Sequence, residues 1–248
     1  MNTDKREFHL SRSHMLAFIS GPLLSESGTG SALSFPPGLT LNEVEAHVRA
    51  AGAGAFSKEI AEIAQASMTG FYLFSGSSAT LVLPPFPIKD RFVSSELAIA
   101  SLTSMLEVDW TISIILVRLG AYAIGLCRGE KILDSKVGTG LVHGRHRQGG
   151  SSANRFRRHR QKQIEQFLIR VCTYANEHLG QFVDDIDYSA FGGARTTIEL
   201  LKKQCPFLSH IKARQLAPLL DVAEPRRYVL ETTVSRIWSS RVIQWSNE

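Results

Sequence analysis

The sequence of 248 residues has little cysteine and no long apolar run. Its three cysteines, Cys127, Cys172 and Cys205, are far apart and form no CxxC pair, which argues against a zinc site and a disulfide framework. The longest apolar stretch, near residues 110–117, is far shorter than the roughly 20 residues of a membrane-spanning helix. The first 18 residues also lack the apolar core of a secretory signal. We therefore expect a soluble protein of the reducing cytoplasm, with no membrane partner.

Acidic residues are absent between Asp134 and Glu165. The same interval holds eight cations: Lys136, Arg145, Arg147, Arg155, Arg157, Arg158, Arg160 and Lys162. The formal net charge of the whole chain is +5, so the chain without these eight residues is slightly acidic. The basic character therefore belongs to one segment, and such a segment typically marks contact with a polyanion.

The overall composition is that of an ordinary globular protein. Hydrophobic residues make up 44% and charged residues 21% of the chain, which excludes a collagen-like or fully disordered protein. Glycine, serine and proline cluster between residues 21 and 38, so residues 1–40 are expected to form an irregular lead-in. At this length, residues 41–248 are expected to form a single domain.

Local patterns predict both helices and strands. Thr40 and Glu43 have the spacing of a helix capping box. Residues 71–87 predict two short strands around a Gly-Ser turn, and residues 110–142 predict three further strands separated by glycine-containing turns. Residues 155–180 predict a long helix with one apolar stripe. The last stretch, residues 226–245, is expected to be a strand or, in its second half, a helix.

These elements predict an α/β fold of the α+β type. Consecutive strands separated by short turns form antiparallel hairpins, so the centre of the chain is expected to be an antiparallel meander. Most of the predicted helices follow the meander, and helices of such folds pack on the sheet. The expected architecture is a mixed sheet with helices packed on it.

The segment from Gly138 to Lys162 contains the strongest functional signal. Three glycines interrupt the last meander strand and permit unusual backbone angles: Gly138, Gly140 and Gly144. An uncharged tip follows, made of Gln148, Gly149, Gly150, Ser151 and Ser152. Either serine can cap the next helix, whose first turns carry Arg155, Arg157 and Arg158. Helix N-termini and guanidinium groups both bind phosphates, so the segment predicts a site for a phosphate-rich partner. The alternative is an ordinary solvated helix face.

The stretch RHRQGGSSANRFRRHR (residues 145–160) resembles the release-factor-like domain of the Vms-type peptidyl-tRNA hydrolases, in particular its bacterial branch. That domain is related to the catalytic middle domain of eukaryotic and archaeal peptide-release factors. In this group a loop with glycine and glutamine leaves a strand and leads into a long basic helix. The resemblance covers about 100 residues from Trp110 onward and implies a ribonuclease-H-like, release-factor middle-domain fold.

The resemblance implies hydrolysis of the ester that joins a peptide to tRNA, in ribosome rescue or quality control. The expected partners are tRNA and the large ribosomal subunit, and DNA is not expected. Gln148 would orient the attacking water, while Gly149 and Gly150 would allow the required backbone conformation. Neighbouring N–H groups would stabilise the oxyanion. The expected RNA-binding residues are Arg145, Arg147, Ser151, Ser152, Arg155, Arg157 and Arg158.

The sequence departs from the family's pattern in the loop. Release factors contain Gly-Gly-Gln, whereas this chain has the order Gln148-Gly149-Gly150. Other members of the Vms-type branch have the catalytic glutamine nearer the strand, where this chain has Gly138-Thr139-Gly140. Either Gln148 acts from a different loop position, or hydrolysis is weak or lost. The alternative function is a non-catalytic RNA- or ribosome-binding module that uses the same basic loop.

Metal chemistry is a third class to consider. A metal nuclease needs several carboxylates that converge on divalent ions. Asp184, Asp185 and Asp187 cluster in the sequence, but clustered aspartates more often form turns and helix caps. The three histidines of the basic segment, His143, His146 and His159, lie among cations that would repel a metal ion. We expect no metal site and no cofactor.

Overall fold

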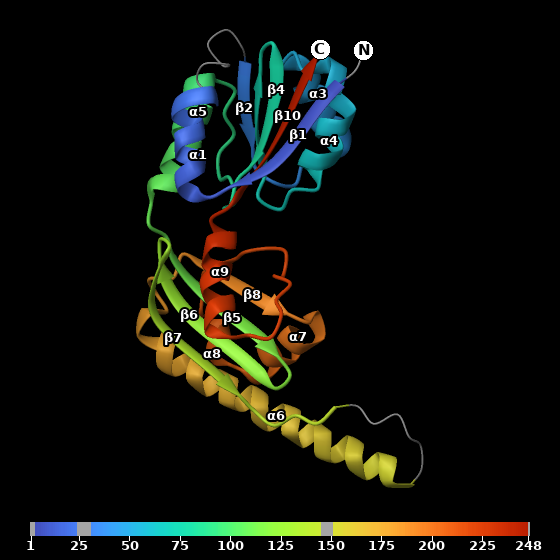
Figure 1. The fold of residues 1–248 in the computed structure, drawn as a ribbon, viewed down its shortest axis with the longest axis vertical. Helices are drawn as coiled ribbons and strands as arrows, with labels where there is room; N and C mark the ends of the chain where they lie inside the picture. The colour runs from blue at the N-terminus through green and yellow to red at the C-terminus, as the bar shows by residue number, and fades with distance from the viewer. Residues whose placement is uncertain (1–2, 24–30, 145–150, 248) are drawn as a thin grey trace. The chain divides into compact units, whose positions relative to one another are not determined.

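Strands from the two ends of the chain lie side by side in one β-sheet of the computed structural model (Figure 1). The structure describes residues 3–23, 31–144 and 151–247. Strand β1 (Thr3–Leu10) pairs antiparallel with β10 (Ser240–Asn247) along its whole length. Residues 1–108 and 235–248 form one compact unit, and residues 109–234 form a second.

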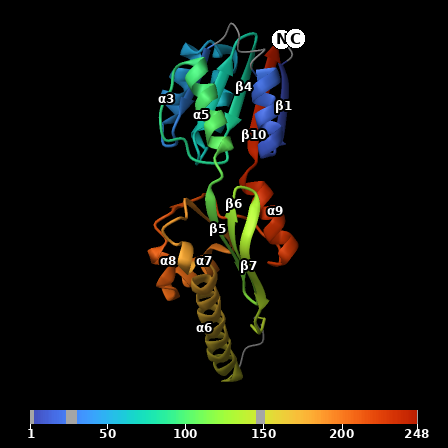
Figure 2. The same ribbon diagram turned by 90° about the vertical axis from the view of Figure 1, so that its left-hand side faces the viewer.

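The first unit is a five-stranded sheet in the order β1-β10-β4-β3-β2, with helices on both faces (Figure 2). Its elements besides β1 and β10 are α1 (Arg12–Phe18), a π-helical turn (Ile19–Leu23), β2 (Ser31–Phe35), α3 (Leu41–Ala50), a 3-10 turn (Gly54–Phe56), α4 (Ser57–Gln65), β3 (Phe71–Ser75), β4 (Ser78–Leu83) and α5 (Ser95–Glu107). Helices α3 and α4 bury one face, around Trp245 and Ile60, and α1 and α5 bury the other, around Tyr72 and Leu102. Both faces are apolar because both are covered.

The second unit is a mixed five-stranded sheet in the order β7-β6-β5-β8-β9. Its elements are β5 (Thr111–Arg118), β6 (Ala121–Arg128), β7 (Lys131–Thr139), α6 (Ser151–Leu179), a 3-10 turn (Gly180–Phe182), β8 (Tyr188–Gly193), α7 (Arg195–Gln204), α8 (Phe207–His210), β9 (Arg214–Gln215) and α9 (Arg227–Ile237), whose last turn belongs to the first unit. Strands β5, β6 and β7 are antiparallel neighbours, whereas β8 is parallel to β5 and β9 is parallel to β8.

Helices cover both faces of this second sheet. Helices α6 and α7 pack over Ile115 and Ile124 on one face. On the other face, the side chain of Leu230 from α9 lies against Gly125 of β6. A Cβ atom added at Gly125 would lie 3.0 Å from Leu230, so the missing side chain lets α9 approach the sheet closely.

The predicted α/β class is confirmed, and so is the antiparallel meander with helices packed on its sheet. The capping box also forms, because the Thr40 side chain accepts from the Glu43 amide while the Glu43 carboxylate accepts from the Thr40 amide. No helix among the described residues is both long and apolar enough to cross a membrane.

The arrangement along the chain differs from the expected lead-in (1–40) and single domain (41–248). The lead-in contributes β1, α1 and β2, and the rest of the chain divides between two units. The order at the C-terminal end is also the reverse of the expected one, since helix α9 comes before strand β10. Strand β1 pairs with residues more than 200 positions away, and such a pairing leaves no local signal in the sequence.

The cysteines also differ from the prediction. Cys172 of α6 and Cys205, which follows α7, form a disulfide with their Cα atoms 5.3 Å apart. They are 33 residues apart in sequence, so only the packing of α6 beside the end of α7 brings them together. Cys127 is free and buried in β6, and its burial raises the pKa of the thiol to about 12.

Candidate nucleic-acid interface

Helix α6 consists of two different parts. From Ile164 to Leu179, apolar side chains recur at three- and four-residue steps and are buried in the core of the second unit: Ile164, Phe167, Leu168, Val171, Ala175 and Leu179. Residues 154–159 are all exposed, and the helix there extends past the strands of its sheet (Figure 1). The buried part therefore anchors an exposed, basic helical segment.

The exposed part of α6 presents its cations to solvent. Arg155, Arg157, Arg158 and Lys162 are exposed, and none of them forms an ion pair or hydrogen bond with another described residue. Arg155, Arg158 and Lys162 share one helix face because they are three or four residues apart. Unpaired guanidinium groups on one face form the kind of surface that phosphates bind.

The chain that follows β7 runs along α6. The amide of His143 donates to the Gln163 Oε1 atom at 3.1 Å, and the Arg160 Nε atom donates to the His143 carbonyl at 2.8 Å. The rings of His143 and His159 lie 6.3 Å apart. Arg160 is therefore partly used inside the protein, unlike the other three arginines of this helix segment.

At two positions at the end of β7, neighbouring aromatic side chains leave room only for glycine. A Cβ atom at Gly138 would lie 2.3 Å from the Tyr122 hydroxyl, and one at Gly140 would lie 2.6 Å from the Phe167 ring. Neither glycine has a positive φ angle, and β7 continues through Gly138 to Thr139. The expectation of unusual backbone angles is therefore wrong for Gly138 and Gly140, and the expected interruption of the strand is wrong for Gly138, whereas β7 does end directly before Gly140. Their role is to let β7 pass close to two aromatic rings.

Several predicted site residues lie outside the described residues. These are the proposed catalytic residues Gln148, Gly149 and Gly150 and the proposed RNA-binding residues Arg145 and Arg147. Ser151 and Ser152 are the first two residues of α6 itself, so neither holds the position before the helix that was expected of a capping serine. Arg155, Arg157 and Arg158 are placed together on the exposed part of α6. The roles given to all these residues stay predictions.

A polar cluster that the sequence does not indicate lies beside the buried part of α6. The His178 Nδ1 atom lies 2.8 Å from the Asp134 Oδ2 atom, which joins the end of α6 to β7. The Lys136 ammonium lies 4.7 Å from the centre of the Tyr174 ring, which stacks on Tyr122. Burial and the nearby Tyr174 raise the pKa of Tyr122. These partners are 38 to 52 residues apart in sequence, so no spacing in the sequence indicates them.

The clustered aspartates do not meet in a metal site within the described part of the chain. The Asp187 carboxylate accepts a hydrogen bond from the Thr111 amide at 2.8 Å, and Asp134 pairs with His178. Among residues 3–23, 31–144 and 151–247, no three His, Cys, Asp or Glu side chains are grouped so that they could hold a metal ion. Asp187 therefore connects the start of β5 to the segment before β8.

A model of the Actinobacteria/chloroflexi VLRF1 release factor matches residues 111–243, which is more than half of the chain. The chain belongs to this family. The match starts at the first residue of β5 and ends within β10, so it includes the meander, the basic segment and α6. The resemblance to a release-factor-like domain is confirmed.

Curated relatives of this chain include archaeal proteins named peptide chain release factor subunit 1. The protein of Thermococcus onnurineus is 32% identical over 159 residues, which are 62% of this chain and 38% of that protein. The protein of Archaeoglobus fulgidus is 29% identical over 138 residues, or 56% of this chain and 34% of that protein. The protein of Thermococcus sibiricus is 25% identical over 186 residues, which cover 69% of this chain and 45% of that protein. The chain spans less than half of the length of these relatives.

The alignment with a crystal structure of the archaeal translation termination factor aRF1 covers 92% of this chain and 73% of the aRF1 chain. The sequences are 18% identical, and the TM-score is 0.39. This likeness is weak, so the family assignment rests on the sequence match alone.

Proposed function

We propose that this protein acts in translation as a release-factor-like peptidyl-tRNA hydrolase, in ribosome rescue or quality control in the cytoplasm. Membership of a release-factor family supports a role in translation. The observation that carries the proposal is the row of exposed cations on the projecting part of α6, which have no partner among the described residues and directly follow the predicted Gln148 loop in sequence. The proposed partners are tRNA and the large ribosomal subunit.

The exposed part of α6 supplies the proposed RNA contact. Arg155, Arg157 and Arg158 bind backbone phosphates, and Arg145, Arg147, Ser151 and Ser152 extend the same contact. The contact is electrostatic and therefore independent of sequence. No aromatic residue except Phe156 lies between residues 145 and 162, which favours phosphate contact over base stacking.

The proposed reaction is hydrolysis of the peptidyl-tRNA ester. The side chain of Gln148 orients a water molecule toward the ester carbonyl, and Gly149 and Gly150 let the backbone approach the RNA. The water oxygen forms a bond to the carbonyl carbon, and the bond to the tRNA ribose oxygen then breaks. The ribose oxygen takes up a proton from the water. The products are the free hydroxyl of the tRNA and the peptide carboxylic acid, which loses its remaining proton to solvent.

A second candidate function is non-catalytic binding of RNA or the ribosome. One observation favours it. Other Vms-type members have their glutamine at the end of this strand. In this chain that position is near Gly138, which packs against Tyr122, so no larger side chain fits there without a shift of the surrounding atoms. If Gln148 does not take over from its different position, the basic helix still binds RNA without hydrolysis.

A release assay separates these two functions. Purified large subunits that carry peptidyl-tRNA are incubated with the wild type, with Gln148→Ala and with Gln161→Ala. Gln161 is an exposed glutamine of α6 and serves as the matched control. We expect the peptide to be released by the wild type and by Gln161→Ala, and release by Gln148→Ala to fall at least a hundredfold.

Ribosome binding without release by any of the three proteins would contradict the hydrolase and support the binding module. Equal release by the wild type and Gln148→Ala would exclude Gln148 as the residue that orients water. Release or RNA cleavage that stops when EDTA is added would indicate a metal-dependent nuclease instead.

A further inference from the structure

Two histidine rings from different segments meet beside the exposed part of α6. The ring of His143, which follows β7, and the ring of His159 in α6 have their centres 6.3 Å apart and an interplanar angle of 31°. Both residues are exposed, and neither ring forms a hydrogen bond or an ion pair with another described residue. Their nitrogen atoms thus have no partner within residues 3–23, 31–144 and 151–247.

The backbone of His143 is held on α6 through both of its polar groups. The amide donates to the Gln163 Oε1 atom at 3.1 Å, and the carbonyl accepts from the Arg160 Nε atom at 2.8 Å. Gln163 and Arg160 are both half-buried. The two rings are therefore brought together by groups other than the rings themselves. A pair that is already in place loses little conformational freedom when it binds a ligand.

The charged side chains next to the pair are cations. Arg155 lies four residues before His159 and Lys162 lies three residues after it, so both are neighbours of this ring on the helix surface. Arg160 adds a third positive charge. The first acidic residue of the helix is Glu165, six positions after His159 and therefore on a different face. The pair is thus surrounded by positive charge, without a carboxylate in contact with either ring among the described residues.

Two imidazoles among cations favour a phosphate group as their ligand. A neutral imidazole donates one hydrogen bond, and a protonated one donates two. Hydrogen bonds of about 2.9 Å to two oxygens of one phosphate can span rings this close together. A metal ion, in contrast, would be repelled by the neighbouring cations. A bound phosphate also offsets the repulsion between protonated rings and these cations, so binding favours the charged form of the pair.

We propose that His143 and His159 bind a backbone phosphate of RNA and take up a proton from solvent when the RNA binds. The inference rests on the RNA contact proposed for α6, and it adds to that contact a phosphate site and its regulation by pH. The complex holds more protons than the free protein. The affinity for RNA therefore rises as the pH falls through the range of about 8 to 5, in which histidine changes its charge.

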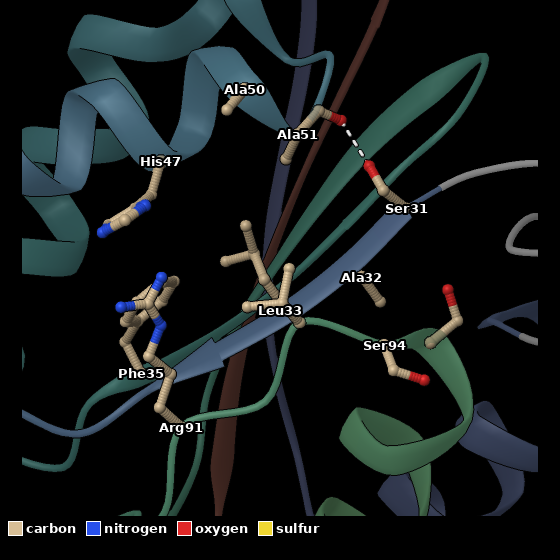
Figure 3. Close-up of a pocket in the computed structure, with 11 residues that line it drawn as sticks. Ser31, Ala32, Leu33, Phe35, His47, Ala50, Ala51, Arg91 and Ser94 are labelled. Atoms are coloured by element: carbon tan, nitrogen blue, oxygen red, sulfur yellow. Dashed lines mark hydrogen bonds between the residues drawn. The ribbon is translucent and has the colours of Figure 1, made fainter.

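A histidine of the first unit provides a comparison. His47 of α3 lines a pocket of about 340 Å³, where its ring stacks on Phe35 of β2 with the ring centres 4.4 Å apart (Figure 3). Arg91 lies against the same ring, with its guanidinium carbon 4.6 Å from the ring centre. No second histidine lines this pocket, which belongs wholly to the first unit. His47 is therefore a histidine near a cation that should add no proton uptake to RNA binding.

The pH dependence of tRNA binding by the full chain tests this proposal. The affinity for deacylated tRNA is measured near pH 6 and near pH 8, at one salt concentration, for the wild type and two double variants. His143→Gln/His159→Gln removes the pair, and His47→Gln/His210→Gln removes two other histidines as the matched control. The wild type and the control should bind roughly tenfold more tightly near pH 6, which corresponds to an uptake of about half a proton. The first double variant should change by roughly twofold or less.

Calorimetry in two buffers with different heats of ionisation measures the proton uptake directly. We expect uptake by the wild type and the control, and little uptake by His143→Gln/His159→Gln. Because the two rings bind one phosphate, each single variant should lose most of the uptake, and the two losses should not add. Amide exchange in β6 should match the wild type in the variants of the pair, since both residues are exposed.

Equal pH dependence of the wild type and His143→Gln/His159→Gln would overturn the proposal and leave the hydrolase untouched. Proton uptake that inorganic phosphate alone reproduces would also overturn it, because the site would then be a simple anion site and not one for RNA. The absence of tRNA binding at either pH would contradict both this proposal and the RNA contact of α6. Proton-linked tRNA binding that depends on the pair, without peptide release, would support this proposal and contradict the hydrolase alone.

Discussion

The two parts of α6 share one helical backbone and differ in what their side chains contact. In the part after Ile164, one face is buried against the sheet of the second unit, and the Cys172 disulfide joins it to the end of α7. In the part before Ile164, cations are exposed and mostly without partners among the described residues. The comparison separates residues that hold the helix in place from residues that are free to bind a partner.

This difference predicts where substitutions act. A change in the buried part should alter the stability of the second unit, and a change in the exposed part should alter RNA binding alone. Amide hydrogen exchange in β6 reports the stability of the second unit without interference from the first.

Leu168→Ala should have the strongest effect on stability. Leu168 is fully buried, and its truncation should lower the free energy of unfolding by roughly 3–5 kcal/mol. The loss should appear as faster exchange of the β6 amides. Ile169→Ala is the control, because the neighbouring Ile169 is 52% exposed and its truncation should cost less than about 1 kcal/mol. Equal costs would contradict the assignment of the buried face.

Removal of the disulfide comes next. In the chain-entropy description, opening a loop closed over 33 residues should cost about 3–4 kcal/mol. The double variant Cys172→Ser/Cys205→Ser and the wild type in dithiothreitol should both show faster exchange in β6. Dithiothreitol should have no effect on the double variant. An unchanged wild type in dithiothreitol would mean that the bond does not stabilise the helix anchor.

Gly138→Ala tests the close contact at the end of β7. The new methyl group would overlap the Tyr122 hydroxyl, so the ring or the strand must shift, at a cost of roughly 1–3 kcal/mol. Gly144→Ala is the matched control, because a Cβ atom there meets nothing within 4 Å, and its effect should be within about 0.5 kcal/mol. Similar stabilities of the two variants would show that Tyr122 moves freely.

Replacement of the exposed arginines should leave stability unchanged and reduce RNA binding. In the triple variant Arg155→Gln/Arg157→Gln/Arg158→Gln, exchange in β6 should match the wild type. A plot of log affinity for tRNA against log salt concentration should become less steep by about 2, because each of the three lost phosphate contacts contributes roughly 0.7 to the slope. The control Arg195→Gln/Lys203→Gln/Lys212→Gln removes the same charge from other exposed positions and should keep the slope. Equal slopes would mean that these arginines are only solvated.

The sequence predicted well those elements that depend on residues close together in the chain. The capping box at Thr40, the hairpin of β3 and β4, and the meander of β5 to β7 depend on neighbours in sequence, and all form as expected. The predictions for the lead-in and the C-terminal stretch were wrong because β1 and β10 become strands by pairing with each other. The basic segment was enough to indicate a release-factor-like domain, although its glutamine loop lies outside the described residues.

The sequence by itself determined the α/β class, the family and the location of the positive charge, because composition, periodicity and motifs are carried by residues close together in the chain. Only the tertiary structure decided which cations are unpaired, why Gly138 and Gly140 are glycines, and that Cys172 meets Cys205. It also placed Arg91 and His47 against the ring of Phe35 in β2. Each of these depends on contacts between residues distant in sequence, and such contacts exist only after the sheets and helices have packed.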